Sequence, residues 1–270
     1  MQQINPADVA SAVYKDLLSI RNKAPLVHNI TNFVVMQSTA NALLALGASP
    51  IMAHAEEELS DIINIAQSLV VNIGTLDTVW INAMHKAMQL AALRKIPIIL
   101  DPVGAGATKL RTKTALQLIQ QVSPTVIRGN ASEIASLLAV GSTKGVDSVF
   151  SSEQSVDVAA RLVTAYDCVV VISGATDICL SANAKLSIKN GSALMTRITG
   201  MGCTATAFIA TFCAVNPDAF VAATHAMIVN GIVGEIAASK ANGPGSFQSI
   251  FYDVLYNLTE KDLLEKIDIE

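Results

Sequence analysis

The chain has 270 residues, of which 51% are hydrophobic and only 4% aromatic, and its formal net charge is -4. This length can bury a large core, and an apolar share made mainly of Ala, Val, Ile and Leu suits a parallel sheet covered by helices on both faces. Lys and Arg are scattered without a basic stripe, which argues against nucleic acid as a partner.

Two long segments, residues 24–55 and 198–217, contain no charged side chain. Both are interrupted by Asn, Thr, Gly or Pro, which are costly or awkward in a membrane-spanning helix, so we expect buried elements and no membrane partner. The N-terminus is polar and amphipathic and does not resemble a signal peptide. The four cysteines show no metal-ligand spacing, which favours a cytoplasmic protein with reduced thiols.

Helical and strand-like segments alternate through the first half of the chain. A helix is expected up to about Lys23, and another over 31–46 that Gly47 can end in the left-handed conformation. Strand-like runs lie at 25–30, 49–53, 69–74, 96–102 and 124–130. The helical patterns between the later strands lie at 56–68, 76–95 and 113–122.

The second half begins with the same alternation and then changes. Helices are expected from Ala131 and from Glu153, followed by a strand at 168–174. Residues 176–195 form short alternating segments, and their Asn190-Gly191 pair indicates an antiparallel hairpin turn. The remaining segments are expected to be helices at 203–215, 218–240 and 247–258 and a short polar tail. The pattern predicts a single α/β domain over residues 1–270, mostly parallel, with an antiparallel edge.

Polar or glycine residues follow the expected strands, at the edge where ligands bind in open α/β sheets. Asp101 ends a buried strand, so its charge must meet a cation, a helix N-terminus or solvent; a simple cap of the turn is the alternative. Arg128 is suited to phosphate oxygens. Glu133 is suited to Mg²⁺ held through water, although Asn130 and Glu133 can equally form a capping pair.

Other strand ends supply weaker candidates. Ser173 places a hydroxyl where phosphate could bind, and Met52 places an apolar side chain where a ligand could rest. His28 and His54 do not have metal-ligand spacing, so ordinary hydrogen-bonded roles are favoured.

The segment RITGMGCTATAF, residues 197–208, combines an anion-binding turn with a thiol. Gly200 and Gly202 lead into an apolar helix, whose N-terminal N–H groups attract anions. The match to a G-x-G-x-x-A dinucleotide fingerprint is formal only, because the segment lies late in the chain and is followed only by helices. Cys203 is the first reactive side chain at the turn, and a helix N-terminus lowers a thiol pKa, so a thiolate is expected to be accessible.

The chain resembles the hydroxyethylthiazole kinases of the ribokinase-like superfamily along nearly its whole length. The resemblance rests on one combination of motifs: HNITN, ASPIMAHA, NIGTL, ILDPVGAGAT, IRGNASEI, GVDS, TGMGC and GPGSF. In the wider superfamily an aspartate base usually stands at the position of Cys203, whereas these kinases have cysteine there. The resemblance implies a three-layer α/β/α fold without a separate lid domain.

The activity implied by the resemblance is phosphorylation of 4-methyl-5-(2-hydroxyethyl)thiazole by ATP with Mg²⁺, in thiamine synthesis or salvage. The catalytic residues would be Cys203, Gly200 and Gly202, with Cys203 assisting near the alcohol. The ATP-binding residues would be Arg128, Ser173, Asp101 and Asn130. The Mg²⁺-organising residues would be Asp101 and Glu133, and the thiazole-binding residues Met52, Gly200, Asn29 and Thr31.

The resemblance also implies a homotrimer with active sites between subunits. Another kinase of the superfamily, such as a hydroxymethylpyrimidine kinase, is the alternative, although HNITN and the cysteine are not its pattern. A dinucleotide-dependent oxidoreductase or a binding module without turnover would explain fewer of the motifs.

Overall fold

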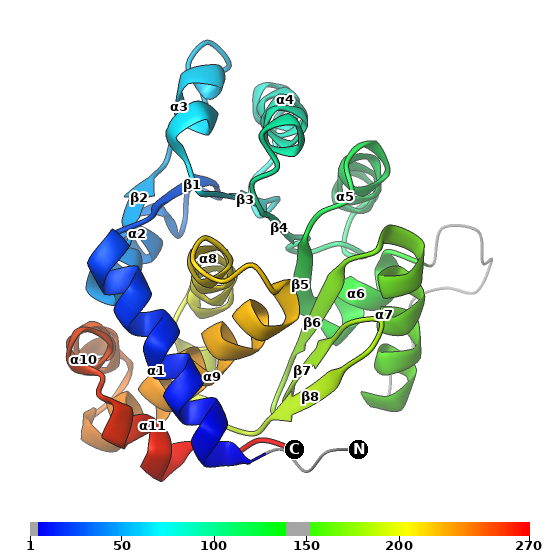
Figure 1. Cartoon of the computed structure of the whole chain (residues 1–270). Helices are drawn as coiled ribbons and strands as arrows, with labels where there is room; N and C mark the ends of the chain where they lie inside the picture. The colour runs from blue at the N-terminus through cyan, green and yellow to red at the C-terminus, as the bar shows by residue number, and fades with distance from the viewer. Residues whose placement is uncertain (1–4, 139–151) are drawn as a thin grey trace.

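The computed structural model describes residues 5–138 and 152–270 and contains one eight-stranded sheet in that part of the chain, ordered β2-β1-β3-β4-β5-β6-β7-β8 (Figure 1). Neighbouring strands from β2 to β6 pair in parallel, and β7 and β8 add an antiparallel edge. The expected sheet is therefore confirmed. The strands are β1 (Leu26–Ile30), β2 (Ser49–Ile51), β3 (Ser68–Asn72), β4 (Ile98–Asp101), β5 (Val126–Asn130), β6 (Val169–Ser173), β7 (Asp177–Leu180) and β8 (Lys185–Ile188).

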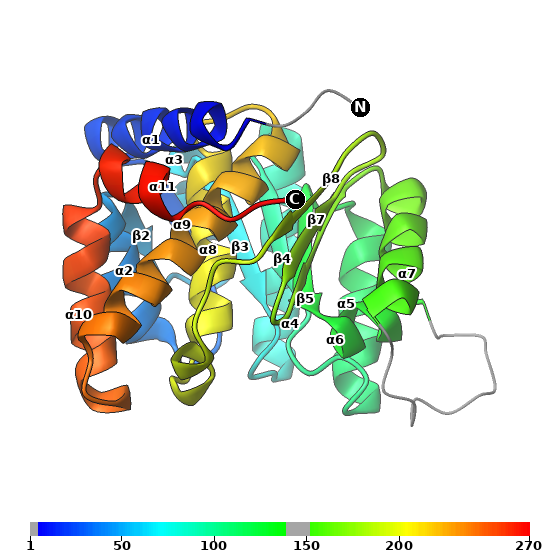
Figure 2. The same cartoon turned by 90° about the horizontal axis from the view of Figure 1, so that it is seen from below.

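Helices cover both faces of this sheet, which gives the expected three layers (Figures 1 and 2). Each face has its own buried apolar cluster, because the strands are buried on both sides. One face packs against α1 (Pro6–Lys23), α2 (Met36–Leu46), α8 (Met201–Cys213), α9 (Ala219–Lys240), α10 (Pro244–Asn257) and α11 (Glu260–Lys266). The other packs against α3 (Leu59–Ile65), α4 (Thr78–Arg94), α5 (Lys109–Gln121), α6 (Ala131–Ser136) and α7 (Ser152–Tyr166).

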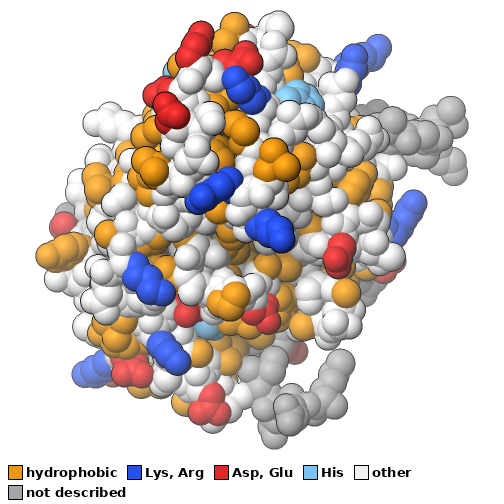
Figure 3. Space-filling model, turned by 45° about the horizontal axis from the view of Figure 1, so that its top comes forward, with side chains coloured by type: hydrophobic (Ala, Val, Ile, Leu, Met, Phe, Trp, Pro, Cys, Tyr) orange, Lys and Arg blue, Asp and Glu red, His pale blue; other side chains and the backbone are white. Residues whose placement is uncertain are grey.

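Charged side chains are interspersed with other types on the outer surface. Figure 3 shows one face of the molecule, on which Lys and Arg lie at separate points among acidic and hydrophobic side chains. This face therefore presents no continuous basic stripe, in agreement with the scattered Lys and Arg of the sequence.

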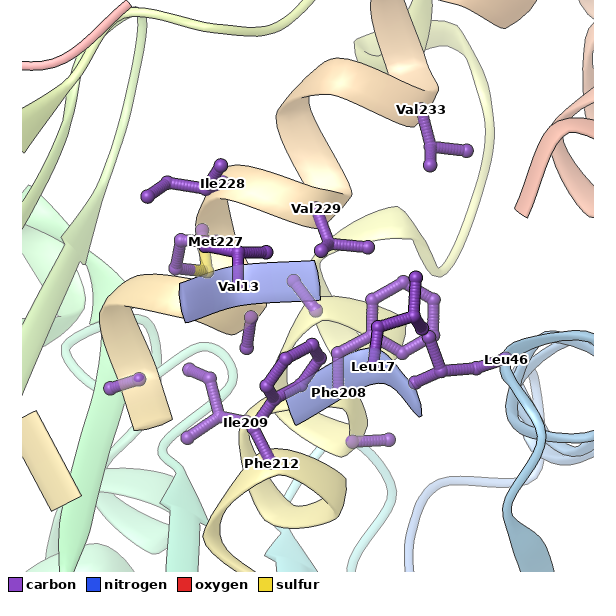
Figure 4. Close-up of a cluster of buried hydrophobic side chains, with 14 of the residues drawn as sticks. Val13, Leu17, Leu46, Phe208, Ile209, Phe212, Met227, Ile228, Val229 and Val233 are labelled. Carbon is purple, nitrogen blue, oxygen red and sulfur yellow. The ribbon is translucent and has the colours of Figure 1, made fainter. Parts of the chain in front are cut away.

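Helices α8 and α9 form the centre of the larger core (Figure 4). Phe208 and Phe212 of α8 are fully buried beside Leu17 of α1 and Val229 of α9. Helix α9 is long and apolar enough to cross a membrane, but 78% of its most apolar window is buried inside the fold. Its uniform hydrophobicity is therefore that of a core helix, apolar on all sides because it is packed on all sides.

The structure corrects the expected position of the hairpin turn. Strands β7 and β8 pair antiparallel with Leu180 opposite Lys185, so their turn lies at residues 181–184. Asn190 and Gly191 follow β8 instead, where the Asn190 side chain donates to the Lys266 carbonyl and to Glu235. These long-range contacts determine the conformation of the pair, which is why its local turn signal was misleading.

Helix boundaries also differ where a cap was not recognised. Helix α5 begins at Lys109 rather than near Lys113, because the Thr108 side chain caps the N–H of Arg111. The expected polar tail is in fact α11, which begins with a capping box of Thr259 and Asp262. The chain then ends in backbone hydrogen bonds between Glu270 and Ser187 on the β8 edge. The GVDS motif, residues 145–148, lies outside the described residues.

Candidate active site

Several polar side chains meet at the carboxyl ends of the parallel strands, beside the N-terminus of α8. Asn72 and Asp101 are register partners on β3 and β4, and Asn130 and Ser173 are register partners on β5 and β6. The loop after β1 brings Asn32 to the same edge, within 2.9 Å of Asn72. The expectation that a site would form at this edge agrees with this arrangement.

The turn into α8 is built by two glycines. Gly200 has a φ of +90°, and a Cβ there would lie 2.8 Å from Val35 Cγ1. At Gly202 an added Cβ would lie 2.7 Å from Arg128 Nη1, so the missing side chain leaves room for the guanidinium. No side chain caps α8 at Gly200, so the first N–H groups are available to an anion beside a positive charge.

A cavity of about 590 Å³ opens next to this turn. Its wall includes Arg128, Ser173, Gly200 and Gly202, and its far side is formed by segment 190–198 and by α9. The Ser173 hydroxyl is held loosely, 3.4 Å from the Gly129 carbonyl oxygen, and Arg128 Nε is buried without a hydrogen-bond partner. A guanidinium and a loosely held hydroxyl at one cavity wall fit a ligand that carries phosphate.

Asp101 is 1% exposed and lies behind the turn. Asn72 Nδ2 donates to its Oδ2 at 2.9 Å and the Thr206 hydroxyl donates to the same oxygen at 2.8 Å, while Oδ1 is buried without a partner. Burial raises the pKa of Asp101 to about 6, although the charge of Arg128 and these hydrogen bonds oppose the rise. The partnerless Oδ1 leaves an oxygen available to a cation, which is one of the three partners expected for this charge from the sequence.

Glu133 forms the capping pair that the sequence left as an alternative. Its Oε2 accepts from the Asn130 N–H at 2.8 Å, and Asn130 Oδ1 accepts from the Glu133 N–H at 2.9 Å. Glu133 Oε1 also accepts from the Gly104 N–H at 2.8 Å, which connects α6 to the loop after β4. Each oxygen of Glu133 accepts one N–H and keeps a further lone pair, so the carboxylate can still accept from a metal-bound water, and residues 5–138 and 152–270 contain no group of three or more His, Cys, Asp or Glu arranged for direct metal binding.

The expectation of an accessible thiolate at Cys203 is wrong. Burial and the neighbouring negative charge of Asp101 raise the Cys203 pKa to about 11. The amides of Asn72 and Asn32 and the charge of Arg128 act in the opposite direction and are outweighed. Desolvation therefore overrides the helix N-terminus, and the side chain at this point is a neutral thiol at pH 7.

Of the predicted site residues, Arg128, Ser173, Gly200 and Gly202 line the cavity, whereas Asp101, Glu133 and Cys203 and the remaining candidates do not. Asn29 and Thr31 are almost fully buried, and Asn29 Nδ2 donates to the Val27 carbonyl. Met52 is half-buried just after β2, and the Asn130 side chain is used to cap α6. His28 has the ordinary role that was favoured, because its Nε2 lies 2.7 Å from the Ala53 carbonyl oxygen.

Four residues of this edge, Asn32, Asn72, Thr206 and Arg111, were not singled out from the sequence. Asn72 and Thr206 contact Asp101, and Arg111 Nη2 and Nη1 donate to the carbonyls of Gly74 and Val103 at 2.7 Å each. A polar Asn at the end of the apolar run LVVN was the available signal for Asn72. Arg111 gave no signal, since it acts across loops that are distant in the sequence.

Comparison with known proteins identifies the family. The model of the hydroxyethylthiazole kinase family matches residues 17–261. A hydroxyethylthiazole kinase from Syntrophus aciditrophicus is 55% identical over 269 residues, which cover 99% of this chain and 98% of that protein. The chain belongs to the hydroxyethylthiazole kinase family. It is therefore a kinase, as the motif combination predicted.

Solved structures agree with this assignment. A structure of the hydroxyethylthiazole kinase protein from Pyrococcus horikoshii superposes with a TM-score of 0.90 at 40% identity, covering 96% of this chain and 98% of that one. A ribokinase-like superfamily protein from Enterococcus faecalis superposes with a TM-score of 0.65 at 14% identity, covering 88% and 87%. The second match concerns the fold alone, and together they confirm the expected ribokinase-like architecture.

Proposed function

We propose that this chain, as a single domain, transfers the γ-phosphoryl group of ATP to the hydroxyl of 4-methyl-5-(2-hydroxyethyl)thiazole, within thiamine synthesis or salvage. The observation that supports it most directly is the Gly200–Gly202 turn, which places the uncapped N-terminus of α8 and the Arg128 guanidinium at one wall of the cavity. Phosphoryl transfer depends mainly on positioning and charge stabilisation, and this wall offers both.

Phosphate binding is assigned to one side of the cavity. The N–H groups of the first turn of α8 would hold the γ-phosphoryl oxygens, and Gly200 and Gly202 allow their close approach. Arg128 and Ser173 would bind the polyphosphate, since both line the cavity, one with a positive charge and the other with a loosely held hydroxyl. Asn130 would act only indirectly, through its cap on α6.

Mg²⁺ is assigned to the Asp101 side of the site. When bound, Mg²⁺ would neutralise negative charge on the polyphosphate. The partnerless Oδ1 of Asp101 is the available oxygen, and Glu133, whose two oxygens each accept one N–H, would contribute through water.

Cys203 is assigned an assisting role near the substrate alcohol. A neutral thiol is a weak proton acceptor, and an alcohol needs little deprotonation before a loose phosphoryl-transfer transition state. Cys203 would thus orient the hydroxyl and assist proton movement without dominating the rate.

The thiazole ring is assigned to Met52, Asn29, Thr31 and Gly200, in a cytoplasmic homotrimer with its sites between subunits. The loop after β1 exposes Phe33 by 60% and Val34 by 68%, directly beside Asn32. Met52 lies outside the cavity of one chain, which is consistent with a substrate pocket that a second subunit completes. The four cysteines are free, as expected in a reducing compartment.

The test is a coupled assay of ADP release with ATP and Mg²⁺. We expect turnover with hydroxyethylthiazole, little turnover with hydroxymethylpyrimidine, and none without an acceptor. Turnover with the pyrimidine alone would assign the pocket to the alternative kinase. Folded protein that released no ADP with either alcohol would contradict the proposal.

A further inference from the structure

A chain of side-chain amides connects the buried carboxylate of Asp101 to the thiol of Cys203. Asn72 Nδ2 donates to Asp101 Oδ2 at 2.9 Å, and Asn32 Nδ2 donates to Asn72 Oδ1 at 2.9 Å. The same nitrogen of Asn32 lies 3.5 Å from Cys203 Sγ. Both asparagines are buried, so water does not compete for the two contacts between Asn32, Asn72 and Asp101, whereas the sulfur of Cys203 is partly exposed.

The direction of each hydrogen bond in this chain follows from Asp101. An ionised carboxylate only accepts hydrogen bonds, so Asn72 must turn its NH₂ toward Asp101 and its Oδ1 away. That oxygen also accepts from the Gly74 N–H at 2.9 Å. It therefore requires the NH₂ group of Asn32, whose second hydrogen is left for the sulfur.

Packing holds Asn32 in this orientation. A Cβ at Gly74 would lie 2.6 Å from Asn32 Nδ2, so the glycine lets the amide lie directly against the backbone of the loop after β3. Arg111 Nη2 fixes that loop by donating to the Gly74 carbonyl at 2.7 Å. The amide is thus confined by the backbone on one side and by Asn72 on another.

We infer that Asn32 and Asn72 are positioning residues, which hold Cys203 in one orientation by keeping an N–H donor on its sulfur. The inference deepens the proposed function and rests on it for its catalytic consequence. A sulfur that accepts an amide hydrogen is held in one rotamer and tolerates negative charge better. Both properties suit a thiol that orients the substrate alcohol and assists its proton.

Thiol reactivity provides a test that does not depend on kinase activity. Cys203 is half-buried and the other three cysteines are buried, so alkylation by iodoacetamide, located by mass spectrometry, can be followed at Cys203. Asn32→Leu removes both N–H donors at similar volume. We expect the alkylation rate at pH 9 to fall about tenfold, because one hydrogen bond to the charged sulfur is lost.

A matched control removes another buried polar group near α8. Thr39→Val deletes a hydroxyl that lies 3.5 Å from Thr204 Oγ1 and does not contact the sulfur, so its alkylation rate should equal that of the unmodified protein. An unchanged or faster rate in folded Asn32→Leu would overturn the inference. If the leucine variant does not fold, Asn32→Ala removes the same donors without adding volume.

A kinetic cycle separates positioning from general structural damage. Asn32→Leu should lower kcat while leaving the KM for ATP within about twofold. In a chain that already carries Cys203→Ala, the same substitution should lower kcat little further. Losses that add fully in the double variant would overturn the inference. Unmodified protein that alkylates as expected but does not phosphorylate the thiazole alcohol would instead contradict only the proposed function.

Discussion

Gly200 and Gly202 are needed at the α8 turn for two different physical reasons. Gly200 has a left-handed backbone with a φ of +90°, which side-chain-bearing residues adopt only with strain. Gly202 lies inside α8, and its importance is that the Arg128 guanidinium occupies the space a side chain would fill. Gly200 therefore allows the backbone conformation of the turn, and Gly202 leaves room for the Arg128 guanidinium, which would face phosphate.

Gly202→Ala is expected to raise the KM for ATP about tenfold or more while changing the melting temperature little. The added methyl group displaces the flexible end of Arg128 and not the backbone. Steady-state kinetics and thermal unfolding measure the two effects. Gly245→Ala is the control, since nothing lies within 4 Å of its added Cβ. An unchanged KM in folded Gly202→Ala would contradict the assignment of Arg128.

Cys203 is expected to contribute modestly to the rate. Cys203→Ser should lower kcat by less than about 10⁴-fold, the upper range for acid–base assistance, and Cys203→Asp should retain activity if the side chain accepts a proton. Because burial raises the thiol pKa to about 11, kcat should not rise tenfold per pH unit between about pH 7 and 9, as it would for an obligatory thiolate. A rise of that size, or a larger loss in Cys203→Ser, would contradict the assisting role.

The negative charge of Asp101 is expected to lower the stability of the fold and to be required for activity. Its folded-state pKa of about 6 exceeds the ordinary 3.8, so the folded chain binds this proton more tightly than the unfolded chain does. The charged group therefore destabilises the fold above pH 6, and this penalty disappears as the pH falls below about 4.

Without Mg²⁺ at pH 7.5, Asp101→Asn should accordingly raise the free energy of unfolding, measured by denaturant titration, by about 1–3 kcal/mol. Its kcat should fall at least about a hundredfold. Its amide oxygen can still accept from Asn72 and Thr206. The stability gain should shrink toward pH 5. A variant that is destabilised at pH 7.5, or fully active, would show that the charge is not held for catalysis.

Among the elements, α5 positions two loops of the site that are distant from it in sequence. Arg111 donates to the carbonyls of Gly74, after β3, and of Val103, after β4, at 2.7 Å each. A Cβ at Gly104 would lie 2.9 Å from Arg111 Nη1, so this glycine also makes room for the guanidinium. The helix therefore holds the carboxyl ends of β3 and β4 together, where Asn72 and Asp101 lie.

Arg111→Ala should increase hydrogen exchange at both loops and lower kcat about tenfold, because hydrogen bonds from a charged group are worth about 1.5–3 kcal/mol each. Hydrogen exchange with mass spectrometry and the ADP-release assay measure these effects. Lys113→Ala, an exposed position on the same helix, should change neither. Equal exchange in both variants would mean that the loops hold their conformation without Arg111.

At the scale of the whole molecule, the loop after β1 lies outside the two buried clusters, although the Phe33 ring packs against Trp80 on one side. Phe33 and Val34 expose most of their apolar surface beside the site, whereas Phe208 and Phe212 are buried at the centre of α8 (Figure 4). Exposed apolar side chains next to a site suggest a subunit contact there, which supports the proposed trimer.

Val34→Asp is expected to dissociate the trimer and to lower thiazole phosphorylation strongly, since a buried unpaired charge at an interface is costly. Size-exclusion chromatography with light scattering measures the mass. Leu93→Asp, at another exposed apolar position on α4, should leave the mass and activity unchanged. A folded Val34→Asp variant of unchanged mass would place the subunit contact elsewhere.

The sequence by itself determined the layered α/β fold, the sheet edge that holds the site and the family. Periodicity reports burial directly, and motifs such as TGMGC and HNITN are contiguous. It also marked Asp101, Arg128 and Cys203 individually. It misplaced the hairpin turn at Asn190, because contacts with Lys266 and Glu235 determine that conformation.

Only the tertiary structure decided how these residues act on one another. The Cys203 pKa depends on burial and on Asp101, which is about a hundred residues away in the chain, so the local helix rule gave the wrong sign. The hydrogen bonds that connect Asp101, Asn72 and Asn32, and those of Arg111, likewise could not be read from the local sequence. Their partners come from different strands and loops, and desolvation and hydrogen-bond direction arise only when folding brings those segments together.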